Sequence, residues 1–267
     1  MMVSVICLAY NHEAYIRDTL EGFVRQKTGF PFEVLVHDDA STDGTADIIR
    51  EYAKRYPEII HPVLETENQY SKGVIIARDI LFPLVRGRYV ALCEGDDYWS
   101  DPLKLSKQVE ALEACPEVDI CAHRVQKIKN GKAHGYVGPG GRRRIIPVER
   151  VIRGGGGFVA TCSLMCRREA YLLDTPMRRE LFFDYTLQIQ GSLHGGMLYL
   201  PDCMAVYRRG VPMSWTARNI GRHKTGHYMK FISMLDALDS YTGGKYSRVI
   251  RARRRRYKIH QFFRKMI

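Results

Sequence analysis

The sequence predicts an α/β fold with a mostly parallel sheet flanked by helices and a helical extension at its C-terminal end. Short β-branched runs alternate with segments that carry apolar residues at helical spacing, the pattern of consecutive βαβ units. Acidic and turn-forming residues follow the apolar runs, where open α/β folds bind ligands. The 267 residues are 45% hydrophobic, which is enough for the core of one large domain.

Four strands are predicted in the first half of the chain, over residues 3–8, 32–37, 60–64 and 88–92, the first and the last of them buried. Between them, one helix follows Asn11, one ends before Pro57, and one lies around residues 74–84. Asn11 is expected to cap the first helix, and Thr42 or Thr45 the second. This order indicates a Rossmann-like sheet. Neither GxGxxG nor GxxxxGK[ST] is present, so dinucleotide and P-loop chemistry are not expected.

The middle of the chain is predicted to continue the sheet. Asp101-Pro102 predicts the start of a helix through Cys115, and a strand over residues 118–122 follows. Asn130-Gly131 is typical of a hairpin turn, and the three arginines at 142–144 indicate a solvated loop.

A glycine run and an aspartate mark the next part. The four glycines at 154–157 form either a flexible loop or a close backbone approach to a ligand, before a predicted strand over 158–166. Asp184 begins a predicted helix over 185–193. It is either the N-cap of that helix or a functional carboxylate beyond the sheet edge.

The charge of the chain is uneven. Ten of the 41 Lys and Arg residues, and no Asp or Glu, lie in residues 240–267, so 31 basic residues face 29 acidic ones elsewhere. An enzyme acting on nucleic acid would carry basic residues across its working face, so no nucleic-acid partner is expected.

The cysteines and the hydropathy pattern predict the compartment. Seven scattered cysteines without a CxxC pair fit neither a disulfide framework nor a zinc site. No apolar run approaches a membrane span, and the first predicted strand begins at Val3, which leaves no room for a signal peptide. We therefore expect a cytoplasmic protein with reduced thiols.

Two acidic segments follow predicted strands. Asp38-Asp39 follows the second strand, and Cys93-Glu94-Gly95-Asp96-Asp97-Tyr98-Trp99 follows the fourth. Adjacent carboxylates at one edge repel each other, and a divalent cation with oxygen ligands relieves that repulsion best. The alternative is a solvated Asp-Asp turn that caps the next helix.

These segments resemble the signature motifs of the family 2 glycosyltransferases, which adopt the GT-A fold. Residues 3–6 with Tyr10-Asn11-His12 resemble the opening strand and nucleotide loop, and residues 37–45 (HDDASTDGT) the second signature. Residues 94–99 (EGDDYW) resemble the metal-binding DxD-type motif of polysaccharide-assembly enzymes. Weaker resemblance to the acceptor half of bacterial members continues from residue 154 to about 216.

The resemblance implies an inverting, metal-dependent transfer of a sugar, UDP-linked, to a glycan or polyprenyl-linked glycan acceptor of cell-surface polysaccharide synthesis. Asp97 would bind Mn²⁺ or Mg²⁺ directly, with Asp96 near the ribose or the metal. Asp184 would be the general base, although Phe182-Phe183 before it departs from many relatives. The absence of a QxxRW motif and of membrane helices favours addition of a single sugar.

The resemblance also implies the donor site. Asp39 would accept a hydrogen bond from the uracil ring, and Lys72 or Arg78 would assist at the phosphates. The residues implied to line the base pocket are Leu8, Ala9 and Tyr10. The chain then divides into a nucleotide-sugar half (1–122), an acceptor half of the same domain (123–217) and a basic helical extension (218–267).

The extension is predicted to form two helices, over 218–238 and 245–267, with aromatic residues beside the basic ones. Such helices either pack on the body or lie on an anionic membrane surface, and we expect peripheral association with the inner face of the cell membrane. Two further functions stay open. One is a sugar nucleotidyltransferase, although the loop after the first strand lacks glycine and basic residues. The other is a non-enzymatic sugar- or polyanion-binding module.

Overall fold

The computed structural model describes residues 1–212 and 225–265. Within them, ten strands form one sheet in the order β3-β2-β1-β4-β9-β6-β10-β5, with β7 beside β6 and β8 beside β10. The strands are β1 (Val3–Ala9), β2 (Phe32–Asp38), β3 (Ile60–Leu64), β4 (Tyr89–Leu92), β5 (Tyr98–Trp99), β6 (Ile120–Lys129), β7 (Lys132–Val137), β8 (Arg144–Ile146), β9 (Met165–Arg167) and β10 (Met197–Arg209). The predicted α/β fold is confirmed.

The first four strands are parallel, and β1, β2 and β3 end at the same level of the sheet. Ala9 at the end of β1 pairs with Asp38 at the end of β2. The turn after β4 reaches the same edge, since the Gly95 N–H donates to Leu8 O at 2.9 Å. The sheet becomes mixed beyond β4, because β9 is antiparallel to both β4 and β6, whereas β10 is parallel to β6. Both acidic segments therefore lie at one edge.

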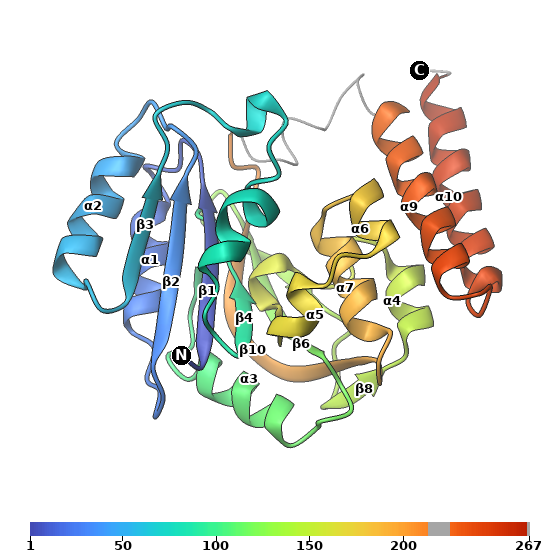
Figure 1. Ribbon diagram of the computed structural model, residues 1–267, viewed down its shortest axis with the longest axis horizontal. Coiled ribbons are helices and arrows are strands. Elements are labelled where there is room, and N and C mark those ends of the chain that lie inside the picture. The colour runs from blue at the N-terminus through green and yellow to red at the C-terminus, as the bar shows by residue number, and fades with distance from the viewer. Residues whose placement is uncertain (213–224, 266–267) are drawn as a thin grey trace.

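Helices cover both faces of the sheet (Figure 1). One face packs on α1 (Ile16–Val24), α2 (Thr45–Arg55) and α3 (Lys104–Glu113). The other face packs on the helices of the second half: α4 (Val148–Gly154), α5 (Arg168–Leu172), α6 (Pro176–Glu180), α7 (Asp184–Ser192), α9 (Thr225–Tyr241) and α10 (Ser247–Lys265). Alternate residues of β1 point into the two cores, Val5 into the first and Ile6 into the second, as strand geometry requires.

The predicted N-caps of the first two helices are wrong. Asn11 does not cap α1, which begins at Ile16. Its backbone is left-handed (φ 56°), and its Oδ1 accepts the Thr42 N–H at 2.8 Å. Neither Thr42 nor Thr45 caps α2. Asp43 accepts the Thr45 N–H through Oδ1 at 3.0 Å instead, and Gly44 is the N-cap.

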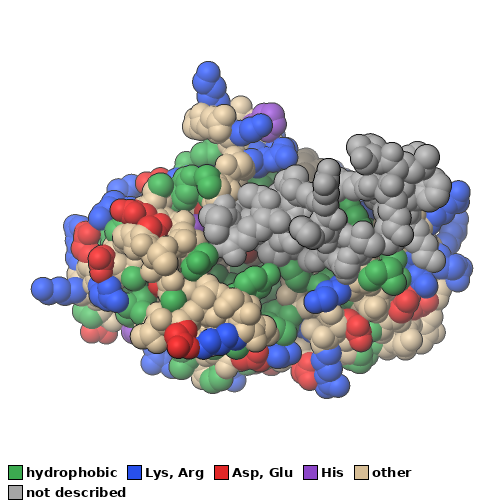
Figure 2. Space-filling view, turned by 90° about the horizontal axis from the view of Figure 1, so that it is seen from above, with side chains coloured by type: hydrophobic (Ala, Val, Ile, Leu, Met, Phe, Trp, Pro, Cys, Tyr) green, Lys and Arg blue, Asp and Glu red, His purple; other side chains and the backbone are tan. Residues whose placement is uncertain are grey.

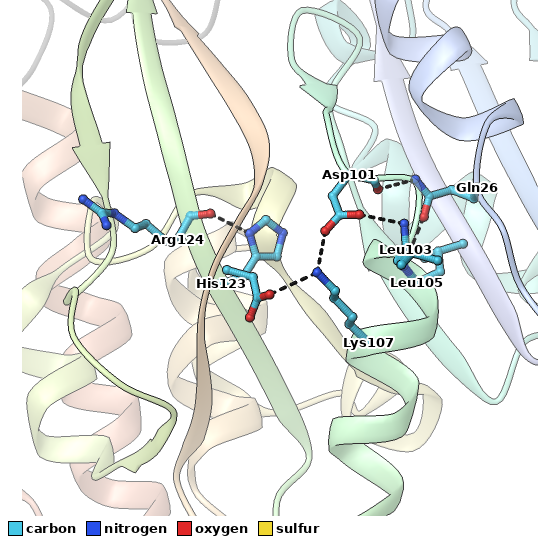
Figure 3. Close-up of polar contacts among 8 residues, drawn as sticks. Gln26, Asp101, Leu103, Leu105, Lys107, His123 and Arg124 are labelled. Atoms are coloured by element: carbon cyan, nitrogen blue, oxygen red, sulfur yellow. Dashed lines mark hydrogen bonds and ion pairs between the residues drawn. The ribbon is translucent and has the colours of Figure 1, made fainter.

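The helix after β5 starts two residues later than predicted, at Lys104 rather than Pro102. Asp101 accepts the Leu103 N–H at 2.8 Å, and Gln26 Oε1 accepts the Leu105 N–H at 3.1 Å (Figure 3). Lys107 holds Asp101 in place through an ion pair of 2.7 Å. A helix start needs partners for its free N–H groups, and here Gln26, which follows α1, and Asp101 of the preceding turn supply them.

Two predicted elements form shorter and irregular structure. The segment 74–84 contains a π-helical turn (Ala77–Leu81) and a 3₁₀ turn (Phe82–Leu84) because Pro83 cannot continue a regular helix. Of the strand predicted over 158–166, only Met165 and Cys166 lie in β9. The hairpin at Asn130-Gly131 is confirmed, with both residues at positive φ.

The C-terminal helices α9 and α10 pack against the second half of the body. Val249, Ile250 and Tyr257 of α10 are buried, and the Tyr257 ring stacks on Phe231 of α9 at 5.2 Å between centroids. The helix predicted over 218–238 falls partly outside the described residues, as does the boundary proposed at residue 217.

Candidate active site

Asp96 and Asp97 occupy the turn between β4 and β5, and both are buried, with 6% and 1% of their surfaces exposed. The Thr19 hydroxyl of α1 lies 3.0 Å from Gly95 O and 2.5 Å from Asp97 O, so it fixes the turn from below. Gly95 has no room for a side chain, since a Cβ there would lie 2.9 Å from His12 Nδ1. The turn is therefore held against the end of β1.

Arg208 of β10 binds the turn from the other side. Its backbone N–H donates to Asp97 Oδ1 at 2.9 Å, and its Nη1 donates to Asp96 O at 3.0 Å. The guanidinium also pairs with Asp18 of α1 and lies over the Tyr98 ring at 4.5 Å from its centroid. β10 thus locks the acidic turn to α1.

Burial dominates the electrostatics of the turn. It raises the pKa of Asp97 well above its ordinary range, and repulsion from Asp96 adds to the effect. Burial also raises the pKa of Asp96, opposed by the positive charges of His12 and Arg208. The Glu94 side chain is exposed, yet the protein around its carboxyl displaces water and so raises its pKa. Repulsion from Asp96 and Asp184 raises this pKa further. Each carboxylate therefore favours an added positive charge.

The turn fits a divalent cation whose coordination shell is completed by oxygen atoms of the substrate. Asp97 Oδ2 is buried, and no N–H or O–H donor in the described part of the chain bonds it. The described residues contain no group of three acidic, His or Cys side chains that could hold a metal alone. Mg²⁺ and Mn²⁺ typically use one or two carboxylates plus phosphate oxygens, so Asp96 and Asp97 suit that chemistry.

The predicted base-pocket residues lie at the end of β1. Asp39 is buried beside them, and its N–H donates to Ala9 O at 3.1 Å. The Asp39 carboxylate already accepts two backbone N–H groups, from Gln69 at 2.7 Å and Tyr70 at 3.2 Å. Carboxylate oxygens have further lone pairs, so Asp39 can still accept a bond from a ligand.

Lys72 and Arg78 are not brought to the acidic turn. Lys72 pairs with Glu67, and Arg78 Nε pairs with Asp79 Oδ1 at 2.6 Å. Both basic side chains are well exposed, and in the described part of the chain neither bonds Asp96 or Asp97. Their predicted role at the phosphates gains no support from these contacts.

Asp184 opens α7 in the wall of a cavity of about 510 Å³, called here the Asp184 cavity. The carboxyl is half-buried and accepts the Tyr185 N–H at 2.6 Å and the Thr161 hydroxyl at 3.2 Å. Removal from water raises its pKa to about 6, although both bonds oppose the shift. Phe183, not Asp184, is the N-cap. The carboxyl therefore faces a ligand-sized space.

The glycine run forms another part of this wall and lies against the C-terminal extension. Gly154, Gly156 and Gly157 line the Asp184 cavity. Gly155 has φ 76°, and a Cβ there would overlap the Arg253 guanidinium of α10. Arg253 donates to Arg153 O at 3.3 Å and to the Tyr257 hydroxyl at 3.0 Å. The backbone at Gly155 is thus approached closely by a side chain of the protein itself, and the predicted close approach of the glycines to a ligand stays a prediction.

Sequence reasoning missed several residues of the site. Arg208 falls in the stretch of weaker resemblance up to residue 216, which implies no role for it, and His12 is expected only as part of the opening loop. Thr19 and Thr161 gave no signal, because their partners are far away in sequence. The two cationic residues of the Asp184 cavity, Lys127 and Arg209, were also missed.

Comparison with known proteins identifies the family. The model of "Glycosyl transferase family 2" matches residues 4–212, which include the acidic turn, the Asp184 cavity and Arg208. The chain belongs to glycosyl transferase family 2.

Two relatives of this family 2 chain match it over different lengths. The uncharacterised protein Rv1520 of Mycobacterium tuberculosis is 40% identical over 223 residues, 83% of this chain and 63% of Rv1520. The chain thus spans less than two thirds of that relative. The Escherichia coli enzyme WfaP, a UDP-Glc:alpha-D-GlcNAc-diphosphoundecaprenol beta-1,3-glucosyltransferase, is 35% identical over 112 residues, 42% of this chain and 41% of WfaP.

Solved structures confirm the predicted GT-A fold. TarS of Staphylococcus aureus in complex with UDP-GlcNAc gives a TM-score of 0.68 at 18% identity, over 90% of this chain and 67% of the TarS chain. The mannosyltransferase PcManGT of Pyrobaculum calidifontis, in complex with GDP-Man and Mn²⁺, gives 0.58 at 20% identity, over 94% of this chain and 68% of the other.

Proposed function

We propose that the protein is an inverting, metal-dependent glycosyltransferase that moves a sugar from a UDP-linked donor to a glycan or polyprenyl-linked glycan acceptor. The observation that carries this proposal is the relation between two acidic groups. The buried Asp96-Asp97 turn, which suits a cation, is joined through Trp99 to the wall of the Asp184 cavity. Trp99 Nε1 donates to Cys162 O at 3.1 Å, and the neighbouring Thr161 hydroxyl donates to Asp184 at 3.2 Å. A donor and an acceptor need two such adjoining sites.

The residues of the chain divide the chemistry between them. Asp97, with Asp96, would hold Mn²⁺ or Mg²⁺, which as a Lewis acid neutralises charge on the departing nucleoside diphosphate. Asp39 and the end of β1 would bind the base. Asp184 would accept the proton of the acceptor hydroxyl, whose oxygen attacks the anomeric carbon from the face opposite the diphosphate. A carboxyl with a pKa of about 6 is largely ionised at neutral pH and a stronger base than an ordinary aspartate.

The relatives support the choice of ligands. TarS binds UDP-GlcNAc, and the name of WfaP gives a UDP-linked donor and a diphosphoundecaprenol-linked acceptor. We infer from these names a UDP-sugar and a lipid-linked glycan for this chain. The direct test screens nucleotide sugars with Mn²⁺ for thermal stabilisation, since a ligand that binds only the folded state raises its stability. Hydrolysis of the stabilising donor then separates an enzyme from a binding module.

We further propose peripheral association with an anionic membrane surface. Arg248, Arg251, Arg255 and Arg256 of α10 are exposed, whereas Arg254 pairs with Asp236 at 2.8 Å. Lys and Arg side chains gather along the edge of the molecule where α10 lies (Figure 2). In the described ranges, no helix is both long and apolar enough to cross a bilayer. A lipid-linked acceptor would be met at such a surface.

A further inference from the structure

The Asp184 cavity carries more positive than negative charge. Lys127 and Arg209 line it, and Asp184 is the only acidic residue among its described lining. Neither cation forms an ion pair with a residue that the structure describes, unlike Arg208, which pairs with Asp18. Two cations without a counter-charge in a ligand-sized space favour a ligand that brings one.

Strand geometry fixes where these cations point. β10 and β6 are parallel neighbours, with Tyr207 beside Lys127 in register. Side chains alternate along a strand, so Tyr207 and Arg209 share the cavity face of β10 while Arg208 between them points to the acidic turn. β10 therefore supplies Arg208, which binds Asp96, and the neighbouring Arg209, which lines the Asp184 cavity.

The rest of the wall is shaped for a compact polar ligand. Phe158 and Tyr136 supply aromatic surface, and the Tyr136 ring is covered by the Arg124 guanidinium at 3.7 Å from its centroid. The glycines leave room beside Asp184. A hydroxyl at Asp184 and an anionic group at Lys127 and Arg209 can thus belong to one molecule.

We propose that the Asp184 cavity selects an anionic acceptor, a glycan whose attacking hydroxyl meets Asp184 while its phosphate or carboxylate meets Lys127 and Arg209. This inference rests on the proposed function. A neutral acceptor would shield both cations from water without a partner, which is unfavourable. An anionic oxygen forms charge-assisted bonds with both, and the guanidinium can bind it through two N–H groups.

The test uses two matched pairs of probes that differ in charge. One pair is octyl β-glucuronide and octyl β-glucoside. The other is octyl N-acetylglucosaminyl diphosphate and octyl N-acetylglucosaminide. Binding to the full chain with UDP and Mn²⁺ is measured by calorimetry at two salt concentrations. We expect at least one anionic probe to bind tenfold or more tightly than its neutral partner, and the stronger pair identifies the anion as carboxylate or diphosphate.

Variants assign that preference to the cavity. The double variant Lys127→Met with Arg209→Met is expected to lose it, whereas Lys127→Arg keeps it. Lys132→Met removes an exposed cation of β7 outside the cavity and is the matched control. Equal binding of both members in both pairs, or a preference that survives in the double variant, overturns the inference. Donor binding and hydrolysis without acceptor, measured on the same proteins, test the proposed function separately.

Discussion

The backbone N–H of Arg208 donates to Asp97 Oδ1 at 2.9 Å, across 111 positions of the sequence. This bond joins β10 to the turn that would hold the cation. Because a main-chain group makes it, side-chain substitution leaves it available. The Arg208 guanidinium acts separately, on Asp96 O and Asp18.

Arg208→Met is therefore expected to lower the apparent affinity for Mn²⁺ about tenfold or more, the usual effect of losing a group that orients a metal ligand. The measurement is a Mn²⁺ titration of thermal stability in the presence of UDP. Asp18→Asn removes only the ion pair and should behave like the wild type. If Arg208→Met binds Mn²⁺ as tightly as the wild type, the Arg208 guanidinium has no role at the cation site.

Asp97→Ala is expected to abolish transfer and Mn²⁺-dependent binding of UDP while the fold survives. Asp97→Asn should lose activity equally, yet without metal it should be at least as stable as the wild type, because burial disfavours the ionised carboxyl. Activity assays and thermal unfolding of both variants check this. Full wild-type activity in excess chelator would contradict the proposed cation site.

Asp184→Asn is expected to lower the transfer rate by roughly 100-fold or more with little change in donor affinity, because an amide cannot accept the proton. The wild-type rate should fall as the pH drops below about 6, since the carboxyl must be ionised to act as a base and its pKa is about 6. Asp174→Asn is the control, because Asp174 is exposed and paired with Arg179. More than about a tenth of the wild-type rate in Asp184→Asn would assign the base elsewhere.

Lys104 gives a pH-dependent stability prediction. It is fully buried, with Nζ 4.0 Å from the Trp99 ring centroid, and burial lowers its pKa from 10.5 to about 8. The unfolded state binds more protons between these values, so wild-type stability should rise with pH in that window relative to Lys104→Met, by at most on the order of 3 kcal/mol. Denaturant unfolding at pH 7 and 10 measures it.

Lys107 on the same helix is the control for that experiment. Its ion pairs with Asp101 and Asp202 raise its pKa, so any stability it contributes is present at lower pH and is lost as the pH rises. That loss begins only above a pH of about 10.5, the ordinary lysine pKa, so Lys107→Met should show almost no pH-dependent change relative to the wild type between pH 7 and 10. The same trend in both variants would point to the alkaline pH rather than to Lys104.

Membrane association is tested best by changing charge, since Val249, Ile250 and Tyr257 fix α10 to the body and truncation would expose that core. Arg251→Glu with Arg255→Glu is expected to reduce co-sedimentation with anionic liposomes, and salt should weaken binding of the wild type. Lys54→Glu, exposed on α2, is the control. If co-sedimentation does not depend on the anionic lipid content of the liposomes, α10 is an ordinary packed helix without a role in membrane binding.

The strands were the most predictable part of the fold. β1 and β2 are apolar runs buried by helices, and local pattern alone identifies them, as it does the shorter and less buried β3. Local reasoning failed where distant partners decide. Asn11 faces Thr42 instead of capping α1, and α3 starts where Gln26, which follows α1, can accept the Leu105 N–H.

The same limit applies to the site. Asp97 and Asp184 carry recognisable chemistry in short motifs, so the sequence could nominate them. Arg208 reaches the turn only because β10 pairs with β5, and Lys127 meets Arg209 only because β6 lies beside β10. Pairing between strands so far apart in the chain leaves no local pattern to predict it.

The contact between Gly155 and Arg253 constrains how this protein can diverge. A larger residue at position 155 would collide with the arginine, and the left-handed backbone there disfavours any side chain. The C-terminal helices therefore cannot be exchanged among related enzymes as an independent module. A chimera that imports another tail must import the matching glycine loop with it, or rebuild the surface on which residue 253 rests.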